Sequence, residues 1–329
     1  MVPFSQFQRE ALYGRDGFYT VARPGGRAGR RGGDFLTSPE VGPLFGAVLA
    51  RYLDEQWELL GRPDPFTVVD AGAGPGTLAR AVLAAAPACD RAGALRYVAV
   101  EVAASQRSLH PARVESRAEL PDEPFEGVIV ANELLDNLPF RLCVFDGAWR
   151  EAYVAADGDR YVEVLSAPLD PRPAVLPAVA PHGARAPLVD EASAWVVAAL
   201  ATLRRGRLLL LDYFRATTAE LVHLPWRDWL RTYRGHERGG HYLAEPGGQD
   251  ITVDVPLDQL PAADSRSTQA EFLRRCGIDG LVAEGRDAWA AGAAGADLAA
   301  LRMRSRVREA EALLDPAGLG GFTVVEYAS

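Results

Sequence analysis

A glycine-rich turn between two apolar segments constrains this chain more than any other feature. Residues 66–71 form a short apolar run that suits a buried parallel strand. Residues 77–86 are rich in alanine, which favours a helix. Between them glycine occupies every second position, at Gly72, Gly74 and Gly76. A strand, a tight glycine turn and a helix in this order are typical of the first unit of a nucleotide-binding α/β sheet.

The acid before this turn indicates which ligand it binds. The pattern is G-x-G-x-G preceded by Asp70, whereas dinucleotide-binding proteins carry G-x-G-x-x-G. Glycines allow positive φ angles and a close approach of a ligand to the backbone. An acid at the strand tip disfavours a phosphate and favours a ligand with positive charge or hydroxyl groups, and S-adenosylmethionine carries both. Two alternatives stay open, a close-packed turn without a ligand and an NAD-dependent dehydrogenase.

The predicted cofactor site combines this turn with the end of a second strand. Residues 95–101 form a predicted strand that ends in Glu101, and an acid at this position of a doubly wound sheet receives the ribose hydroxyls. We expect the glycines to make room for the methionine and ribose parts, with Asp70 near the amino-acid end. The predicted cofactor-binding residues are Asp70, Gly72, Gly74, Gly76, Thr77, Glu101 and Asn132.

A third apolar strand, predicted for residues 125–131, ends in a group of polar side chains. Ligands of open α/β sheets lie outside the carboxyl ends of the strands. We therefore expect this polar group to face the same crevice as Asp70 and Glu101. Its members are Asn132, Glu133, Asp136 and Asn137. Helix capping by Asn132 is the structural alternative, but it accounts for only one residue of this polar group.

The composition argues against several classes of partner. The chain of 329 residues has 35 basic and 44 acidic residues and a net charge of −9, which disfavours binding to a nucleic-acid backbone. No apolar run is long enough for a membrane span, and residues 1–18 do not resemble a signal peptide. The three cysteines are scattered, which suits a cytoplasmic protein. His236 and His241 lie among glycines, and we expect no metal site there.

The N-terminal region carries a predicted lid. An Arg- and Gly-rich loop at residues 23–33 precedes a predicted helix over residues 38–60, for which Ser38 is a suitable N-cap. A mobile segment anchored on a rigid end is what a lid needs, so we expect Asp34, Thr37 and Ser38 to lie near the donor or the acceptor. The alternative for Asp34 is a turn aspartate that bonds its own backbone.

The remaining segments complete the predicted fold. Residues 141–154 alternate around Asp146-Gly147 and predict a β-hairpin. A buried strand is predicted over residues 207–214, with Asp212 and Tyr213 at its tip. The alternation of strands and helices from residue 66 to residue 214 predicts an α/β fold with a seven-stranded, mostly parallel sheet.

Several segments together carry a resemblance to one family. Two are specific, namely Gly-Asp-Phe-Leu-Thr-Ser-Pro-Glu at residues 33–40 and Asn-Glu-Leu-Leu-Asp-Asn-Leu-Pro at residues 132–139. Further matching segments are residues 70–78, 211–213, 230–236, 249–252, 268–273 and 318–325. In these segments the chain resembles the MidA-like class I methyltransferases, which include the mitochondrial complex I assembly-factor arginine methyltransferase. It departs from the family pattern at Phe214, where a glycine is usual, and at Asp228-Trp229, where Gly-Thr or Gly-Ser is usual.

The resemblance implies a domain organisation as well as a fold. The implied fold is the Rossmann-like α/β fold of class I methyltransferases, with an additional helical and loop subdomain. The expected segments are an N-terminal helical segment and lid (residues 1–60), an S-adenosylmethionine-binding core (61–215), a substrate-side helical and loop insertion (216–315) and a C-terminal strand that returns to the core sheet (316–329).

The resemblance also implies methyl transfer from S-adenosylmethionine, with a protein arginine side chain as the favoured acceptor. A guanidinium is protonated at neutral pH and needs carboxylates that orient it and take up a proton. We expect Glu133 and Asp136 in this role, with Asn132 holding the geometry and with Tyr213 and His236 on the substrate side. The alternatives are a small-molecule O- or N-methyltransferase and a non-catalytic assembly or scaffold protein. We expect neither a nucleic acid nor a membrane as partner, and a homodimer is compatible with this interpretation.

Overall fold

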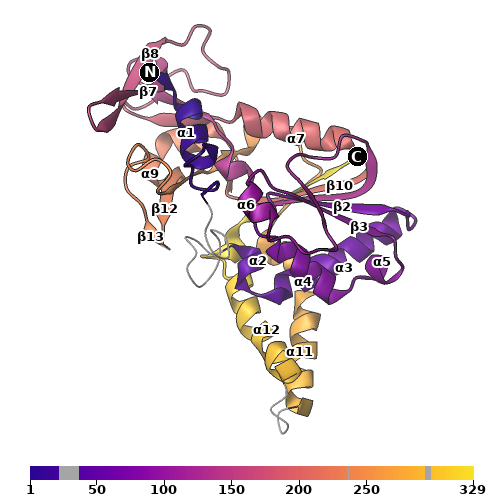
Figure 1. The fold of residues 1–329 in the computed structure, drawn as a ribbon. Coiled ribbons are helices and arrows are strands. Elements are labelled where there is room, and N and C mark those ends of the chain that lie inside the picture. Colours follow the sequence, from indigo (N-terminus) through magenta and orange to yellow (C-terminus); the bar gives the residue numbers. More distant parts are fainter. Residues whose placement is uncertain (22–36, 236, 293–297) are drawn as a thin grey trace. The chain divides into compact units, whose positions relative to one another are not determined.

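The computed structural model describes residues 1–21, 37–235, 237–292 and 298–329 (Figure 1). The chain forms two compact units. The sheet unit comprises Ala28–Asn132, Leu200–Leu211 and Ala263–Ser329, and the inserted unit comprises Met1–Arg27, Glu133–Ala199 and Asp212–Ala262. These boundaries differ from the four segments expected from the sequence, because the chain leaves the sheet unit after Asn132, returns to it at Leu200 and leaves it again after Leu211.

A seven-stranded sheet forms the centre of the sheet unit, with the strand order β16-β17-β10-β5-β2-β3-β4. The strands are β2 (Phe66–Ala71), β3 (Leu95–Val100), β4 (Glu115–Arg117), β5 (Phe125–Asn132), β10 (Leu203–Asp212), β16 (Ser265–Thr268) and β17 (Thr323–Ala328). The pairs β10–β5, β5–β2, β2–β3 and β3–β4 are parallel, and β16 pairs with β17 antiparallel. The α/β fold is therefore confirmed, with a mixed sheet, and so is the parallel pairing expected between residues 66–70 and 97–101.

Both faces of the central strands are buried. Val68 and Leu209 belong to the cluster that packs against helices α3 (Pro43–Leu59) and α4 (Thr77–Ala85). Their neighbours Val69 and Leu208, which point to the opposite face, are fully buried as well. A strand buried on both faces is a continuous apolar run, which explains why these strands are recognisable in the sequence.

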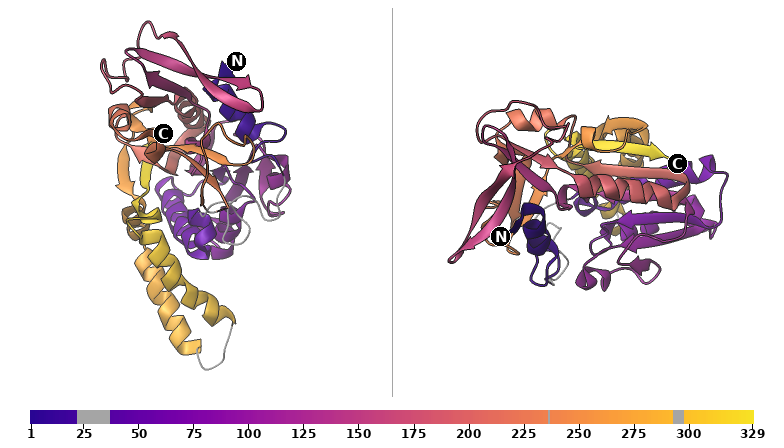
Figure 2. Two further views of the ribbon diagram at one scale, coloured as in Figure 1. Left: turned by 90° about the vertical axis from the view of Figure 1, so that its left-hand side faces the viewer. Right: turned by 90° about the horizontal axis from the view of Figure 1, so that it is seen from above.

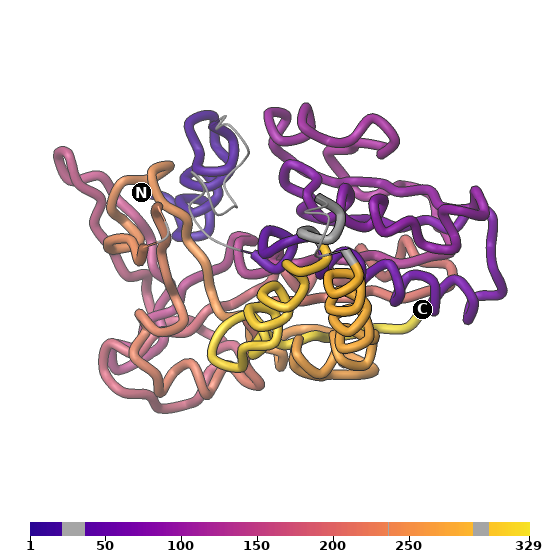
Figure 3. The backbone as a smooth tube through the Cα atoms, turned by 90° about the horizontal axis from the view of Figure 1, so that it is seen from below, coloured from indigo at the N-terminus to yellow at the C-terminus, as the bar shows by residue number. Residues whose placement is uncertain are grey.

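Further helices complete the sheet unit. They are α2 (Ser38–Val41), α5 (Ala88–Arg91), α6 (Ala104–Arg107), α10 (Gln269–Arg275), α11 (Ile278–Gly292), α12 (Leu298–Leu314) and the short 3-10 helix η4 (Leu319–Gly321). Helices α11 and α12 lie side by side (Figure 3). Helix α10 begins with a capping box, in which the Thr268 side chain accepts from the Glu271 backbone and Glu271 accepts from the Thr268 backbone.

The single helix expected over residues 38–60 is divided into α2 and α3 at Gly42. The Glu309 carboxylate of α12 lies against this break and accepts a hydrogen bond from the Leu44 backbone N–H at 2.8 Å. A Cβ on Gly42 would lie 2.3 Å from Cδ of Glu309, so only glycine leaves room for the carboxylate. The expected N-cap is also wrong by one residue. Thr37 is the N-cap of α2, whereas the buried Ser38 hydroxyl donates to Gln269 Oε1 at 2.8 Å.

A five-stranded antiparallel sheet forms one part of the inserted unit (Figure 2). Its strands are β1 (Val2–Pro3), β6 (Arg141–Phe145), β7 (Trp149–Asp157), β8 (Arg160–Pro168) and β9 (Arg185–Leu188). The antiparallel pair of β6 and β7 confirms the hairpin expected over residues 141–154. Cys143, Trp149 and Leu176 are buried in a separate apolar cluster of this unit.

The rest of the inserted unit contains strands as well as the helices and loops expected there. One small sheet has the order β13 (Glu237–Arg238), β12 (Leu230–Arg234), β14 (Asp250–Val253), and a second pairs β11 (Phe214–Arg215) with β15 (Val255–Pro256). The helices are α1 (Phe4–Tyr13), α8 (Thr218–His223), α9 (Trp226–Trp229) and the 3-10 helices η1 (Leu135–Asn137) and η2 (Leu257–Gln259), while α7 (Asp190–Thr202) continues into the sheet unit. Strand β14 lies next to η1, although the two segments are far apart in the sequence.

Replacement of Glu309 tests the cap on α3. We expect Glu309→Ala to lower the free energy of unfolding by about 1–3 kcal/mol, because the buried Leu44 N–H and the helix N-terminus lose a charged acceptor. Glu309→Gln, which keeps an acceptor without the charge, should have a smaller effect. The matched control is Glu311→Ala on the exposed side of α12. Urea unfolding of the four proteins measures the difference, and equal effects at the two positions would contradict this role of Glu309.

Candidate functional site

The glycine turn after β2 has the backbone conformation that only glycine adopts readily. Gly72, Gly74 and Gly76 have φ angles of 74°, 51° and 79°. A Cβ added to Gly74 would meet no described atom within 4 Å, so this part of the turn borders open space. The turn therefore offers the backbone of Gly74 to a ligand without an intervening side chain.

Glu101, directly after β3, is bonded to this turn. Its Oε2 accepts from the Gly74 N–H at 3.0 Å, and its Oε1 accepts from the Ala103 N–H at 2.8 Å. Burial raises the pKa of Glu101, although these two hydrogen bonds oppose the shift. Each carboxylate oxygen has a second lone pair, so Glu101 retains the capacity to accept from a pair of ribose hydroxyls.

Asp70 and Thr77 lie at the two ends of the turn. The Asp70 side chain is buried and accepts from the Tyr97 hydroxyl at 3.1 Å. Burial raises the pKa of Asp70 to about 7. Thr77 begins α4, and its hydroxyl oxygen accepts from Arg80 at 3.2 Å. The expected place of Asp70 near the amino-acid end of the cofactor stays a prediction.

A buried carboxylate shapes the turn at the start of the inserted unit. Asp212, the last residue of β10, is completely buried. Its Oδ2 accepts from the backbone N–H groups of Leu134 and Leu135 at 3.2 and 2.8 Å, and its Oδ1 accepts from the Tyr213 N–H at 2.8 Å. Burial, followed by the charge of Asp136, raises the pKa of Asp212 well above its usual value. The bonds to Leu134 and Leu135 determine where η1 presents its side chains.

Asp136 is the side chain that η1 presents with an unused acceptor. It is 3% exposed, and its Oδ2 accepts from the Thr252 hydroxyl at 2.6 Å. Its Oδ1 is buried and has no hydrogen-bond partner in the described part of the chain. Burial raises the pKa of Asp136 to about 6, opposed by the Thr252 bond and by the charge of Arg231. This arrangement can accept one further N–H or O–H donor.

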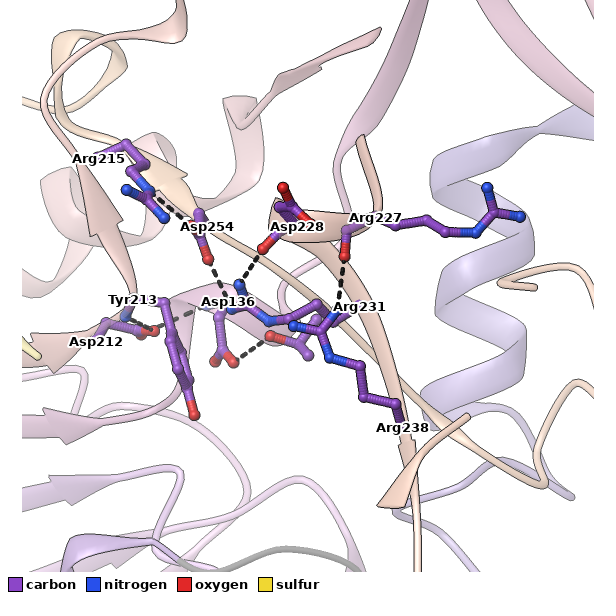
Figure 4. A network of polar contacts seen from close by, with 10 residues as sticks. Asp136, Asp212, Tyr213, Arg215, Arg227, Asp228, Arg231, Arg238 and Asp254 are labelled. Carbon is purple, nitrogen blue, oxygen red and sulfur yellow. Dashed lines mark hydrogen bonds and ion pairs between the residues drawn. The ribbon is translucent and has the colours of Figure 1, made fainter. Parts of the chain in front are cut away.

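Beside Asp136, the inserted unit already holds one of its own guanidinium groups between a carboxylate and an aromatic ring (Figure 4). Arg231 forms an ion pair of 2.6 Å with Asp254, and its Cζ lies 4.7 Å from the centre of the Tyr213 ring. Its Nη1 also donates to the Asp228 carbonyl at 2.8 Å. Asp254 accepts in addition from Arg215 at 2.8 Å. The ion pair with Asp254 and the bond to Asp228 supply the paired charge that a buried guanidinium needs, although Nε of Arg231 has no hydrogen-bond partner among the described residues.

A second group of bonds connects η1 with the N-terminal segment. Asn137 Nδ2 donates to Asp250 Oδ1 at 3.0 Å, and the Tyr19 hydroxyl lies 3.1 Å from the same oxygen. Burial raises the pKa of Asp250 to about 7. Asp136 and its neighbour Asn137 are thus both bonded to β14, Asp136 to Thr252 and Asn137 to Asp250.

The other predicted site residues have different surroundings. Asn132 ends β5 and is half-buried, and Glu133 follows it with a left-handed φ of 53°, which is uncommon for a glutamate. The negative charge of Glu133 contributes to the raised pKa of Tyr213, for which burial is the main cause. Asp34 and His236 lie outside the described residues. Thr37 and Ser38 begin α2, where the Ser38 hydroxyl is engaged with Gln269.

Sequence reasoning missed much of the environment of Asp136. It placed Asp212 at a strand tip without a role, and it assigned none to Tyr19, Arg231, Asp250, Thr252 or Asp254. The sequence signal for Asp250, Thr252 and Asp254 is the alternation of polar with apolar residues over residues 250–255, because a carboxylate inside an apolar strand requires a buried partner.

Comparison with known proteins identifies the class to which this fold and these residues belong. The sequence model of a family described as "Putative S-adenosyl-L-methionine-dependent methyltransferase" matches residues 48–275. The chain belongs to this family of S-adenosylmethionine-dependent methyltransferases, as the motifs in its sequence predicted, and S-adenosylmethionine is the cofactor of the family.

Two groups of individual relatives are similar to the chain. The mitochondrial protein arginine methyltransferase NDUFAF7 homolog of Drosophila melanogaster is 28% identical over 295 residues, covering 77% of this chain and 64% of that protein. The NDUFAF7 protein of Mus musculus is 24% identical over 298 residues, with coverages of 75% and 65%. The chain thus spans slightly less than two thirds of these relatives. A crystal structure from Burkholderia thailandensis with bound S-adenosyl-homocysteine has a TM-score of 0.83 at 29% identity, covering 100% of this chain and 88% of that one.

The residues of the sheet unit fit this cofactor. The open side of Gly74 leaves space for a ligand against the backbone, and the buried Glu101 can accept from vicinal hydroxyls. The glycine turn and Glu101 would hold S-adenosylmethionine, and Asn132 at the end of the neighbouring strand β5 would border it. These roles of individual residues are proposals.

The structure and the relatives bear on a membrane, a metal ion and the location. The described part of the chain contains no helix long and apolar enough to cross a membrane, and no group of three or more His, Cys, Asp or Glu side chains that could hold a metal ion. Two of the relatives above carry the word mitochondrial in their names. The cytoplasmic location and the homodimer expected for this chain stay predictions.

The raised pKa of Asp70 predicts a pH-dependent effect of Asp70→Asn on stability. The folded pKa of about 7 exceeds the usual value of 3.8, so the wild type is at its most stable with Asp70 protonated and loses this stability as the pH rises through 7. Asparagine mimics the protonated form. We expect the stability of Asp70→Asn relative to wild type to improve between pH 4.5 and pH 8 by on the order of 2–4 kcal/mol.

Chemical unfolding of the ligand-free proteins at both pH values measures this change. Asp122→Asn, at an exposed aspartate of the same unit, is the control and should show no such trend. A pH-independent difference for Asp70→Asn would mean that Asp70 is ionised throughout this range.

Proposed function

We propose that this chain transfers a methyl group from S-adenosylmethionine to the guanidinium of a protein arginine side chain. One observation carries the proposal. Asp136 Oδ1 is a buried carboxylate oxygen without a partner among the described residues, on a turn whose geometry is fixed by Asp212 and Thr252. The names of the NDUFAF7 relatives support the choice of acceptor.

Chain connectivity supports this role of Asp136, which follows strand β5 by four residues in the sequence. Strand β5 pairs with β2 in parallel, with Ala131 opposite Ala71, so both strands end at the same edge of the sheet. The glycine turn follows β2 at this edge, and the segment that leads to Asp136 follows β5. Ligands of open α/β sheets bind at this edge, where neighbouring strands send their turns in different directions.

The proposed mechanism requires positioning and removal of one proton. The bound cofactor supplies a methyl group on a sulfonium sulfur. Asp136 accepts a hydrogen bond from a guanidinium N–H, which holds the acceptor nitrogen in line, and it takes the proton that this nitrogen loses on methylation. Glu133 adds a second negative charge near the acceptor, and Asn132 keeps the segment in place. Because the pKa of Asp136 is about 6, the carboxylate is in its ionised form at neutral pH.

Asp136→Asn tests this role. We expect kcat to fall about 100-fold or more, because the amide can orient the acceptor but cannot take the proton. Wild-type activity should fall as the pH decreases through about 6, where Asp136 becomes protonated, and the residual activity of the variant should lack this dependence. The affinity for S-adenosyl-homocysteine, measured by calorimetry, should be unchanged.

The control for this test is Asp159→Asn, an exposed aspartate of the inserted unit. The acceptor is identified by incubating the chain and radiolabelled S-adenosylmethionine with protein extract from a host strain that lacks the gene, followed by mass spectrometry for methylarginine. Turnover of a small metabolite without new methylarginine would show that the methyl acceptor is a small molecule and not a protein. Cofactor binding without any transfer would favour a scaffold protein.

A further inference from the structure

The loop that follows β3 returns to the glycine turn at His110. The His110 Nε2 lies 2.8 Å from the carbonyl oxygen of Gly74, and its Nδ1 lies 2.8 Å from Oγ of Ser116 in β4. The N–H of the same glycine donates to Glu101. Both polar backbone groups of Gly74 are therefore bonded to side chains of one loop, Glu101 at its start and His110 near its end.

The chemistry of these contacts determines the tautomer of His110. A carbonyl oxygen only accepts, so Nε2 must carry the proton that the ring donates to Gly74. In the neutral ring, Nδ1 then accepts from the Ser116 hydroxyl. Burial lowers the pKa of His110, and the charges of Arg80 and Arg107 act in the same direction, while the bond to Gly74 opposes them. Ser116 thus selects the tautomer that can bond the turn.

Two further contacts join the same loop to the turn. A Cβ added to Gly76 would lie 3.1 Å from Cδ of Pro111 and 3.2 Å from Cδ2 of His110, so the loop packs closely on this glycine. Arg80 of α4 donates to the carbonyl oxygens of Pro75 and Leu109, at 2.8 and 3.1 Å. The loop thus packs against one side of the turn. The space into which a Cβ on Gly74 would point remains open.

We propose that His110 is a positioning residue of the cofactor site, which holds Gly74 in its left-handed conformation and keeps Glu101 aligned for the ribose of the cofactor. Gly74 has a φ of 51°. Without the bond to His110 it could adopt many other conformations, since glycine has the largest backbone freedom. A turn already ordered by His110 loses less entropy when the ligand binds. The role of His110 is therefore to raise cofactor affinity, and it is independent of the acceptor.

Calorimetric titration with S-adenosyl-homocysteine tests this role. We expect His110→Ala to raise the Kd about tenfold, the size expected for one lost hydrogen bond with its ordering effect. His110→Gln places an amide N–H where Nε2 lies and should restore most of the affinity, whereas His110→Asn reaches only the position of Nδ1 and should behave like the alanine variant. His182→Ala, at an exposed histidine of the inserted unit, is the control.

A second measurement separates positioning from simple stabilisation of the fold. Hydrogen exchange of the Gly74 amide in the ligand-free protein should accelerate in His110→Ala and His110→Asn and remain slow in His110→Gln. Ser116→Ala should weaken binding less than His110→Ala, and the double variant should be no worse than His110→Ala alone, because Ser116 acts through the ring.

Equal Kd values for His110→Gln and His110→Asn would overturn the proposal, and so would a lower melting temperature with an unchanged Kd in His110→Ala. Should His110→Ala fail to fold, the comparison of glutamine with asparagine decides. The arginine methylation proposed above can fail its test while the His110 substitutions still change the Kd for S-adenosyl-homocysteine. In that case only the proposed acceptor is wrong, and the role of His110 stands.

Discussion

Burial of the parallel strands on both faces is the constraint on which the rest of this structure depends. An apolar strand covered on both sides has no place for a charged side chain along its length, so polar groups collect where the strands end. Glu101 follows β3, Asn132 ends β5 and Asp212 ends β10. The side chains available for chemistry are therefore concentrated in the turns that leave the sheet.

Buried carboxylates at these positions are stabilised mainly by backbone N–H groups. Glu101 accepts from Gly74 and Ala103, and Asp212 accepts from Leu134, Leu135 and Tyr213. Each acid thereby orders a turn that carries functional groups, the glycine turn in one case and η1 in the other. Both oxygens of each acid accept hydrogen bonds, which an amide with its single oxygen cannot do, and this explains why an acid rather than an amide suits these positions.

The two turns differ in what they offer to a ligand. The glycine turn leaves open space beside Gly74, which suits a large neutral or cationic ligand whose ribose can bond Glu101. The η1 turn leaves one buried oxygen of Asp136, which suits a single donor. The nearby Arg231, between Asp254 and Tyr213, illustrates how this unit accommodates a guanidinium with a carboxylate and an aromatic ring.

The sequence by itself determined the family, the cofactor and the parallel strands, because these depend on local signals: glycine spacing, apolar runs and acids at strand ends. It also identified Glu133 and Asp136 as candidates. The tertiary structure decided which partners surround Asp136, since Thr252, Asp212 and Arg231 reach it from segments about 80 to 120 residues away. It likewise decided the break at Gly42 and the contact of His110 with Gly74, because a helix end or a turn carries no sequence mark of the distant side chain that packs on it.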